Sequence, residues 1–515
     1  MSKSRTEQRW DFGTHSSGGG LKRASVRGGF VTLTSQACKF LLQAGSLFIL
    51  GRMLSPDAFG LVAMVAAVLT FAQMLRDLGL SAATIQRPEI THEQVNTLFW
   101  VNVALGFGLM SLTACVAPAI SWFFKEPRLT GIVLGSSLSF FASGLGVQHS
   151  ALLSRQMRFK SLAIADCGSM FVSVVSAIVC VMMGMGYWSL VVMQVVLAAG
   201  NSAICWVLCS WRPSAPNLHK EALPMIKFGR ELTGFSFLNY FARNIDNVLI
   251  GRVWGPVQLG LYAKAYQILL LPLTQLNGPM QSVALPMLSR LTGEPERYRM
   301  AYVRVIRLLN FAAMPLVGFM FVTADWLIPA MLGPKWGPAV PMYRWLAVAG
   351  VLQPLASSTG WLFMSQGRSA DMFRWAFIST ALIVASIVGA LHWGATAVSA
   401  SYGITCTFLV CPILFWFVTR KGPVRMGDFY SGMALPGGVT LAAANVFEFV
   451  RLFVGNPNPY LAVLVSAVVW PLILCGILVM LPSGREALRE MIDLVRSNIP
   501  ASITRRRRIP QVVIA

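Results

Sequence analysis

Two sets of polar side chains recur 200 residues apart inside otherwise apolar stretches of this 515-residue chain. Each set has spacings of three, four and three residues, which place its members on one face of a helix. In a membrane such a face must turn toward protein or water. Two such faces, one in each half of the chain, therefore predict a shared polar cavity. The sets are Gln36, Lys39, Gln43 and Ser46, and Ser236, Asn239, Arg243 and Asp246.

Positive charge prevails on these faces. Arg243 lies near the middle of its apolar stretch, Lys39 lies in the matching one, and Lys264 adds a cation to the stretch that follows. Arg binds phosphate oxygens through two parallel hydrogen bonds and Lys adds a point charge, so the pattern favours an anionic cargo. The alternatives are a buried structural pair between Arg243 and Asp246, one turn apart, and lysines that extend to a membrane interface.

Ten side chains are the candidate site residues. Asp77 ends the second apolar stretch at the position that matches Asn277, 200 residues later. The two acids are the candidates for ion coupling, and the other eight are the candidates for substrate binding. The predicted substrate-binding residues are Arg243, Lys39, Lys264, Asn239, Gln43, Gln36, Gln275 and Asn277, and the predicted ion-coupling residues are Asp246 and Asp77.

A short sequence motif also occurs twice in the chain. GRMLSPDAFGLVA begins at Gly51 and GRVWGPVQLGLYA begins at Gly251, again 200 residues apart. Each copy closes one apolar stretch and opens the next, with Pro and Gly at positions that suit a turn and a helix start. The similarity is local and fades beyond this pair of stretches. It predicts two parallel repeats around a central site, with Arg52 and Arg252 in an architectural role in the turns.

Composition identifies the elements that position these residues. The chain is 55% hydrophobic and only 12% charged, too little charge to cover a soluble protein of this length. The apolar runs reach about 20 residues, the length of a membrane-spanning helix, and lack the alternation of barrel strands. We expect an all-α polytopic membrane protein with fourteen spans: 30–51, 58–76, 97–120, 130–153, 162–184, 188–210, 230–252, 260–285, 306–329, 341–364, 373–392, 395–419, 434–453 and 459–481.

The basic residues test this layout, because short cytoplasmic loops collect Lys and Arg. With a cytoplasmic N-terminus, about three quarters of the 42 Lys and Arg residues fall in cytoplasmic segments, so both termini are predicted to be cytoplasmic. The net charge of +22 then marks topology and contact with anionic lipid headgroups, and not nucleic acid. The end of the chain reads as a short interfacial helix with a basic run or, equally, as a solvated tail.

These spans group into predicted domains. We expect a repeat of six helices in each half of the chain and two further helices at the C-terminal end. The predicted parts are a disordered cytoplasmic tail (1–29), an N-lobe (30–210), a cytoplasmic linker (211–229), a C-lobe (230–419), a cytoplasmic loop (420–433), spans thirteen and fourteen (434–481) and a basic cytoplasmic tail (482–515).

Motifs for catalysis are missing from the sequence. It has no GxxxxGK[ST] phosphate loop, no GxSxG elbow and no paired-carboxylate DxD. The nine Cys form no CxxC pair, and the five His are scattered without metal-ligand spacing. We therefore expect no cofactor, no metal and no enzymatic activity. Transport is favoured over catalysis.

The motif regions resemble a known family. LGRMLSPDAFGLVAMVAAVLTFAQMLRDLGLSAATIQRPEIT, RNIDNVLIGRVWGPVQLGLYAKAYQI and PMLSRL are similar to the Wzx-type polysaccharide exporters, in the branch of the colanic-acid and succinoglycan exporters. This branch belongs to the multidrug/oligosaccharidyl-lipid/polysaccharide flippase superfamily. The likeness extends over most of residues 25–430 and is strongest in the two motif regions.

The resemblance implies two six-helix lobes around a central cavity, with two further helices behind them. It implies a flippase that moves undecaprenyl-pyrophosphate-linked oligosaccharide across the bacterial inner membrane by alternating access, for exopolysaccharide or lipopolysaccharide biosynthesis. The expected partners are that lipid-linked oligosaccharide, anionic membrane lipids and polysaccharide polymerase or assembly proteins. Arg243 is then the candidate ligand of the pyrophosphate, while the amides and hydroxyls meet the sugars.

Three other functions compete with this interpretation. A multidrug antiporter of the same superfamily favours cationic drugs and acidic cavities, whereas Arg243 supplies positive charge here. A membrane polysaccharide polymerase or glycosyltransferase is disfavoured by the short outer loops. A scaffold that does not transport predicts that changes in the polar faces are harmless.

Overall fold

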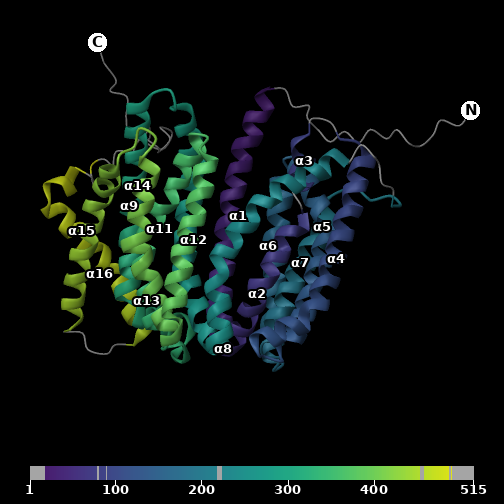
Figure 1. Ribbon diagram of the computed structural model, residues 1–515, viewed down its shortest axis with the longest axis horizontal. Helices are drawn as coiled ribbons and strands as arrows, with labels where there is room; N and C mark the ends of the chain where they lie inside the picture. The colour runs from purple at the N-terminus through teal and green to yellow at the C-terminus, as the bar shows by residue number, and fades with distance from the viewer. Residues whose placement is uncertain are drawn as a thin grey trace, which may run out of the picture. The chain divides into compact units, whose positions relative to one another are not determined.

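The computed structural model describes residues 18–77, 80–87, 90–216, 223–452, 458–486 and 489. Over these ranges the chain is helical and has no strand (Figure 1), which confirms the all-α prediction. The α-helices are α1 (Gly18–Met53), α2 (Pro56–Asp77), α3 (Leu80–Gln86), α4 (His92–Phe124), α5 (Leu129–Arg155), α6 (Phe159–Met182), α7 (Trp188–Leu208), α8 (Leu223–Arg290), α9 (Pro295–Val322), α10 (Ala324–Leu332), α11 (Ala339–Ser365), α12 (Ser369–Ala390), α13 (Ala395–Thr405), α14 (Cys411–Thr419), α15 (Met426–Arg451) and α16 (Pro459–Met480).

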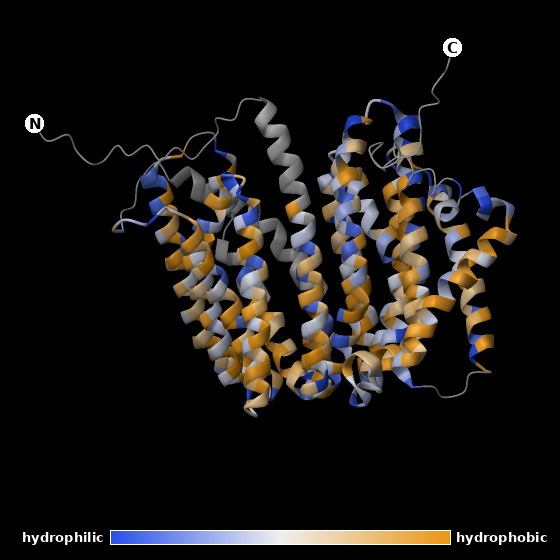
Figure 2. Ribbon diagram, turned by 180° about the vertical axis from the view of Figure 1, so that it is seen from behind, coloured by the Kyte–Doolittle hydropathy of each residue, from blue (hydrophilic) through white to orange (hydrophobic). Residues whose placement is uncertain are grey.

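Ten helical segments among the described residues are long and apolar enough to cross a membrane. Figure 2 shows hydrophobic residues along the helices, with hydrophilic residues frequent toward their ends. The chain is thus a multi-pass membrane protein, and the count of fourteen spans stays a prediction.

Individual helix boundaries differ from the predicted spans. Helix α1 begins at Gly18 and so extends into the predicted tail of residues 1–29, whose first part lies outside the described residues. The seventh and eighth predicted spans lie in one element, α8, which is interrupted at Gly255 by non-helical dihedrals (φ 78°, ψ −177°). The ninth predicted span is divided between α9 and α10, and the twelfth contains a π-helical segment, η4 (Cys406–Val410), between α13 and α14.

The chain divides into two compact units. The first comprises Met1–Ile268, Ile328–Leu346 and Ala376–Thr405, and the second comprises Leu269–Leu327, Ala347–Trp375 and Cys406–Ala515. The division passes through α8, α10, α11 and α12, and it has no boundary at residues 211–229, where the lobe boundary is predicted. The two lobes stay a prediction.

In the first unit, close helix crossings build the packing. Helix α5 packs against α4 and α7, while α6 packs against α7 and α1. Where α4 crosses α5, a Cβ added to Gly106 would lie 2.8 Å from the Phe140 carbonyl oxygen, and one added to Gly144 would lie 2.9 Å from the Asn102 carbonyl oxygen. Small residues at such crossings let membrane helices approach closely, which fixes the walls that carry the polar side chains.

In the second unit, α15 packs against α9 and α16. Trp326, Phe447 and Trp470 form an aromatic core between these helices and α10. Near the start of α9, Arg299 donates two hydrogen bonds to Asp428 of α15, at 2.7 and 2.8 Å. Paired, hydrogen-bonded charges of this kind fix the register of one helix against its neighbour.

One helix-end geometry recurs along the described part of the chain. After α5, Met157 has φ 53°, and after α11, Gly367 has φ 68°. The next residues, Arg158 and Arg368, each donate their backbone N–H to the carbonyl five residues earlier, at 3.0 and 2.8 Å. This is a helix end closed through one left-handed residue. Lys125 after α4 (φ 56°) and Gly184 after α6 (φ 78°) close their helices in the same way, so this geometry is a common helix end in the chain and does not mark the internal repeat.

Candidate functional site

The two copies of the repeated motif contact each other within the first unit. A Cβ added to Gly60 would overlap the carbonyl oxygen of Pro256, and one added to Gly260 would overlap the carbonyl oxygen of Pro56. The relation is reciprocal: each copy supplies the glycine that lets the other copy's backbone approach. Only glycine fits such an approach, which explains why Gly and Pro recur at these positions.

Arg52 has the architectural role that its position in the motif predicted. Its guanidinium donates to the carbonyl oxygens of Ala330 and, at 3.4 Å, Met331. From the other side, the indole N–H of Trp336 donates to the Gly51 carbonyl at 2.8 Å. The end of α1 is thereby tied to the segment around α10. Its repeat partner, Arg252, lies over the ring of Phe123 with its guanidinium carbon 5.8 Å from the ring centroid.

A polar pocket of about 540 Å³ lies among α1, α2, α3, α5, α6 and α7 of the first unit. Its lining includes the amides of Gln73, Gln194 and Asn201 and the hydroxyls of six serines. A cavity of this size is in the range of about 300–1,000 Å³ that small-molecule sites occupy. Polar side chains in apolar helices are unfavourable in lipid, so their gathering around one cavity indicates a site that holds water or a polar ligand.

An ion pair forms part of the pocket wall. The Lys39 ammonium on α1 donates to Asp166 Oδ2 on α6, with about a third of each side chain exposed. The Asn201 amide on α7 donates to the other carboxylate oxygen, Oδ1, at 3.0 Å. Three helices thus meet at one carboxylate. Among the predicted substrate-binding residues whose side chains the structure describes, Lys39 is the one in this pocket wall.

The other residues predicted on α1 lie elsewhere. Gln36 and Gln43 are exposed and do not line the pocket, and the Gln43 carbonyl accepts a 3.0 Å hydrogen bond from Ser46. Sequence reasoning missed Asp166 and Asn201. The signal was present, since Asp166 is an acid inside the fifth predicted span and such residues are rare without a function.

Lys264 and Asp246 are held by neighbours in the first unit. The Lys264 ammonium lies 4.1 Å from the centroid of the Phe59 ring and donates to Gln267 Oε1 at 2.7 Å. The buried Asp246 carboxylate accepts from the Tyr262 hydroxyl at 2.7 Å and from a backbone N–H at 2.8 Å. The cation–π contact fixes the Lys264 side chain within the unit.

The remaining candidates divide into two groups. The side chains of Asn239, Arg243 and Asp77 lie outside those that the structure describes. Gln275 is exposed and Asn277 is half-buried, and both belong to the second unit. Their roles stay predictions. Among the described residues, no three His, Cys, Asp or Glu side chains are grouped so as to hold a metal ion.

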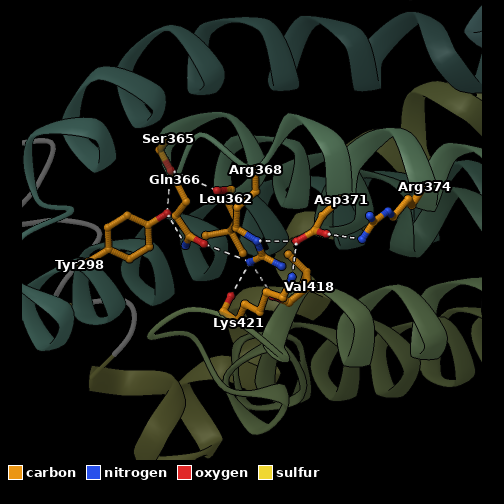
Figure 3. A network of polar contacts seen from close by, with 9 residues as sticks. All are labelled: Tyr298, Leu362, Ser365, Gln366, Arg368, Asp371, Arg374, Val418 and Lys421. Atoms are coloured by element: carbon orange, nitrogen blue, oxygen red, sulfur yellow. Dashed lines mark hydrogen bonds and ion pairs between the residues drawn. The ribbon is translucent and has the colours of Figure 1, made fainter.

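A second polar cluster lies in the second unit, at the turn between α11 and α12 (Figure 3). The Arg368 guanidinium donates to the carbonyl oxygens of Val418, at 3.0 Å, and Lys421, and to the Asp371 carboxylate, at 3.2 Å. The network continues through Gln366 to the hydroxyl of Tyr298, at 3.1 Å. Arg368 thus ties this turn to the end of α14. Every group in the network has a partner, which is typical of a structural clasp.

Comparison with known proteins gives a family and a fold. A family model described as "Polysaccharide biosynthesis protein" matches residues 49–341, more than half of the chain. The teichuronic acid biosynthesis protein TuaB of Bacillus subtilis (strain 168) is 29% identical over 423 residues, covering 81% of this chain and 87% of its own. The succinoglycan biosynthesis transport protein ExoT of Rhizobium meliloti (strain 1021) is 24% identical over 477 residues, covering 91% and 95%. The lipopolysaccharide biosynthesis protein WzxC of Escherichia coli (strain K12) is 27% identical over 392 residues, covering 74% and 77%.

Among solved structures, the lipid II flippase MurJ in its inward closed conformation aligns with a TM-score of 0.68 at 12% identity, covering 87% of this chain and 97% of its own. An inward-facing multidrug resistance transporter of the MATE family aligns with a TM-score of 0.58 at 14% identity, covering 76% and 95%. At these identities the likeness shows a shared fold alone.

Proposed function

The chain belongs to the polysaccharide biosynthesis protein family, and from this premise we propose that it is a flippase for lipid-linked oligosaccharide. It moves undecaprenyl-pyrophosphate-linked repeat units across the bacterial inner membrane by alternating access, for exopolysaccharide or lipopolysaccharide synthesis. The observation that carries the proposal is the family match over residues 49–341, together with a relative named as a succinoglycan transport protein along 91% of the chain.

The structure supports this proposal with a polar pocket in the apolar helices of the first unit. A transported saccharide must leave water, so its hydroxyls need hydrogen-bonding partners inside the protein. The pocket wall offers amides, hydroxyls and the Lys39–Asp166 pair. The MurJ-like fold adds support, because that fold is known in a lipid II flippase.

We assign the cargo's charged part to Arg243, with Lys264 as the second cation, and ion coupling to Asp246 and Asp77. Asn239, Gln43, Gln36, Gln275 and Asn277 are assigned to the cargo path on sequence position alone. Arg243→Ala tests the central assignment: full export at normal protein level would refute it, because a phosphate ligand cannot be removed without loss.

The protein acts as a transporter and not as an enzyme, and it requires no cofactor. Both termini face the cytoplasm, where the basic residues of the C-terminal tail meet anionic lipid headgroups. Polymerase or assembly proteins receive the flipped repeat units. A multidrug antiporter is the alternative, and a deletion strain with normal drug sensitivity excludes it.

The decisive experiment measures on which face the lipid-linked oligosaccharide lies in a deletion strain. Spheroplasts are probed with a lectin or glycosidase that cannot cross the membrane. A flippase predicts a protected intermediate that the wild-type gene releases and the Arg243→Ala variant does not. An intermediate already exposed outside, but not polymerised, would move the function to a later step and refute the proposal.

A further inference from the structure

Three serine hydroxyls that line the pocket of the first unit donate their protons to backbone carbonyl oxygens and not into the cavity. Ser139 donates its hydroxyl proton to the Ser136 carbonyl at 2.7 Å, Ser143 donates to the Ser139 carbonyl at 2.6 Å, and Ser202 donates to the Ala142 carbonyl at 2.6 Å. A serine hydroxyl has one proton, so each of these oxygens can only accept further hydrogen bonds. The serine wall of the pocket is therefore rich in acceptors.

The charges of the pocket balance each other. Lys39 is the one cation and Asp166 the one anion among the described lining residues, and they are paired. Both oxygens of Asp166 already accept hydrogen bonds, one from Lys39 and one from Asn201. A phosphate group has only acceptor oxygens and negative charge, so it would face serine acceptors and a carboxylate. The pocket therefore disfavours a phosphate.

A saccharide has the complementary chemistry. Each sugar hydroxyl can donate one hydrogen bond, which the serine oxygens accept, and can also accept one. The donors for the second kind of bond face the same cavity, since Gln73 and Gln194 line it and an amide presents two N–H groups.

We propose that this pocket binds the saccharide part of the cargo through its hydroxyl groups, and that Lys39 and Asp166 are a positioning pair that keeps phosphate out. The proposal rests on the proposed flippase function and divides its cargo site in two. It changes the role of Lys39: the residue serves the sugar end of the cargo, and the pyrophosphate is left to other cations.

The test measures binding to the full-length protein in detergent with two probes. One is the oligosaccharide released by mild acid from the lipid-linked intermediate, followed by saturation-transfer NMR, and the other is inorganic pyrophosphate, followed by calorimetry. Gln194→Ala should weaken saccharide binding about threefold to tenfold, the effect of one neutral hydrogen bond, and leave pyrophosphate binding unchanged. Gln281→Ala, an exposed amide of α8 in the second unit, is the matched control.

Asp166→Asn leaves Lys39 without its counter-charge, so pyrophosphate binding should rise about tenfold while saccharide binding falls. The double variant Lys39→Gln/Asp166→Asn is neutral again and should return pyrophosphate binding to the wild-type level. A misfolded protein would not regain wild-type pyrophosphate binding, so this return shows that the change in the single variant comes from charge. Glu294→Gln, an exposed acid paired with Arg297 in the second unit, controls for the loss of an ion pair.

Two results would overturn the proposal. One is wild-type binding of pyrophosphate that Lys39→Gln abolishes while saccharide binding persists. The other is saccharide binding that neither Gln194→Ala nor Asp166→Asn changes. The sidedness of the lipid-linked oligosaccharide is measured in parallel. A wild-type protein that fails to move it refutes the flippase, whereas a protein that moves it with unchanged saccharide binding in the variants refutes only the pocket.

Discussion

The reciprocal contact between the two motif copies makes a sharp prediction for Gly60→Ala. Besides the carbonyl oxygen of Pro256, the Pro256 Cα would lie 2.9 Å from the new methyl group, so backbone and not a flexible side chain blocks it. The two segments must separate by roughly 1 Å or more to restore ordinary packing distances. Overpacking of this kind costs about 1–3 kcal/mol, while replacing a helical glycine by alanine contributes up to about 1 kcal/mol of stability.

The net expectation is a destabilisation of about 1–2 kcal/mol, which lowers the melting midpoint of a chain of this length by roughly 1–2 °C. The assay is thermal unfolding of the purified protein followed by tryptophan fluorescence. Gly108→Ala is the control, because an added Cβ there meets no atom within 4 Å and should stabilise its helix. Gly260→Ala should behave like Gly60→Ala, and the double variant should be less destabilised than the two single effects added, because both push the same segments apart. A Gly60→Ala protein as stable as Gly108→Ala would refute the reasoning.

Three further predictions concern other parts of the chain. Gly255→Ala has open space around the new Cβ but forces φ 78° on an alanine, so it should destabilise by about 1–2 kcal/mol from backbone strain alone, measured in the same melting assay. Arg368→Gln should lower the melting midpoint by about 1–3 °C because it removes the hydrogen bonds to the Val418 and Lys421 carbonyl oxygens, whereas Arg374→Gln, on a largely exposed side chain, should change it little. Glu126 lies in the loop between α4 and α5, and hydrogen bonds from Arg128 hold its pKa below the ordinary value of 4.5. These hydrogen bonds therefore stabilise the fold fully at pH values above 4.5, and their contribution is lost as the pH falls through the lowered pKa. Glu126→Gln should flatten this part of the stability–pH curve, and an unchanged curve would contradict it.

Much of the fold could be predicted from the sequence because the membrane imposes a simple rule. A helix needs about 20 apolar residues to span a bilayer, so the long helices coincide with the predicted apolar stretches. What the sequence could not supply is the division of a single apolar stretch into two helices. The interruption of α8 at Gly255 lies in the turn predicted between the seventh and eighth spans, whereas the division between α9 and α10 falls inside the ninth predicted span and depends on backbone geometry.

The site shows a similar division. The spacing of Lys39 on a polar face led to a residue of the pocket wall, because helical periodicity is strong and local. The partner Asp166 lies 127 residues away on another helix, and no local pattern links the two. The direction of the serine hydrogen bonds could not be predicted from the sequence either, because it depends on which carbonyl oxygen each hydroxyl contacts in the folded chain. The polar face of a helix can be predicted from the sequence, but whether its side chains offer donors or acceptors to a ligand depends on tertiary contacts.

The reciprocal contact of Gly60 with Pro256 and of Gly260 with Pro56 has the form of an isologous interface, in which the same patch meets itself across a two-fold axis. Two-fold homodimers make contacts of this kind between separate chains. Here both patches belong to one polypeptide, as expected if a gene for half of the protein once encoded a self-associating subunit and was later duplicated and fused. Each copy of the motif is then the binding partner of the other, so the effect of changing one glycine depends on the backbone of the opposite copy.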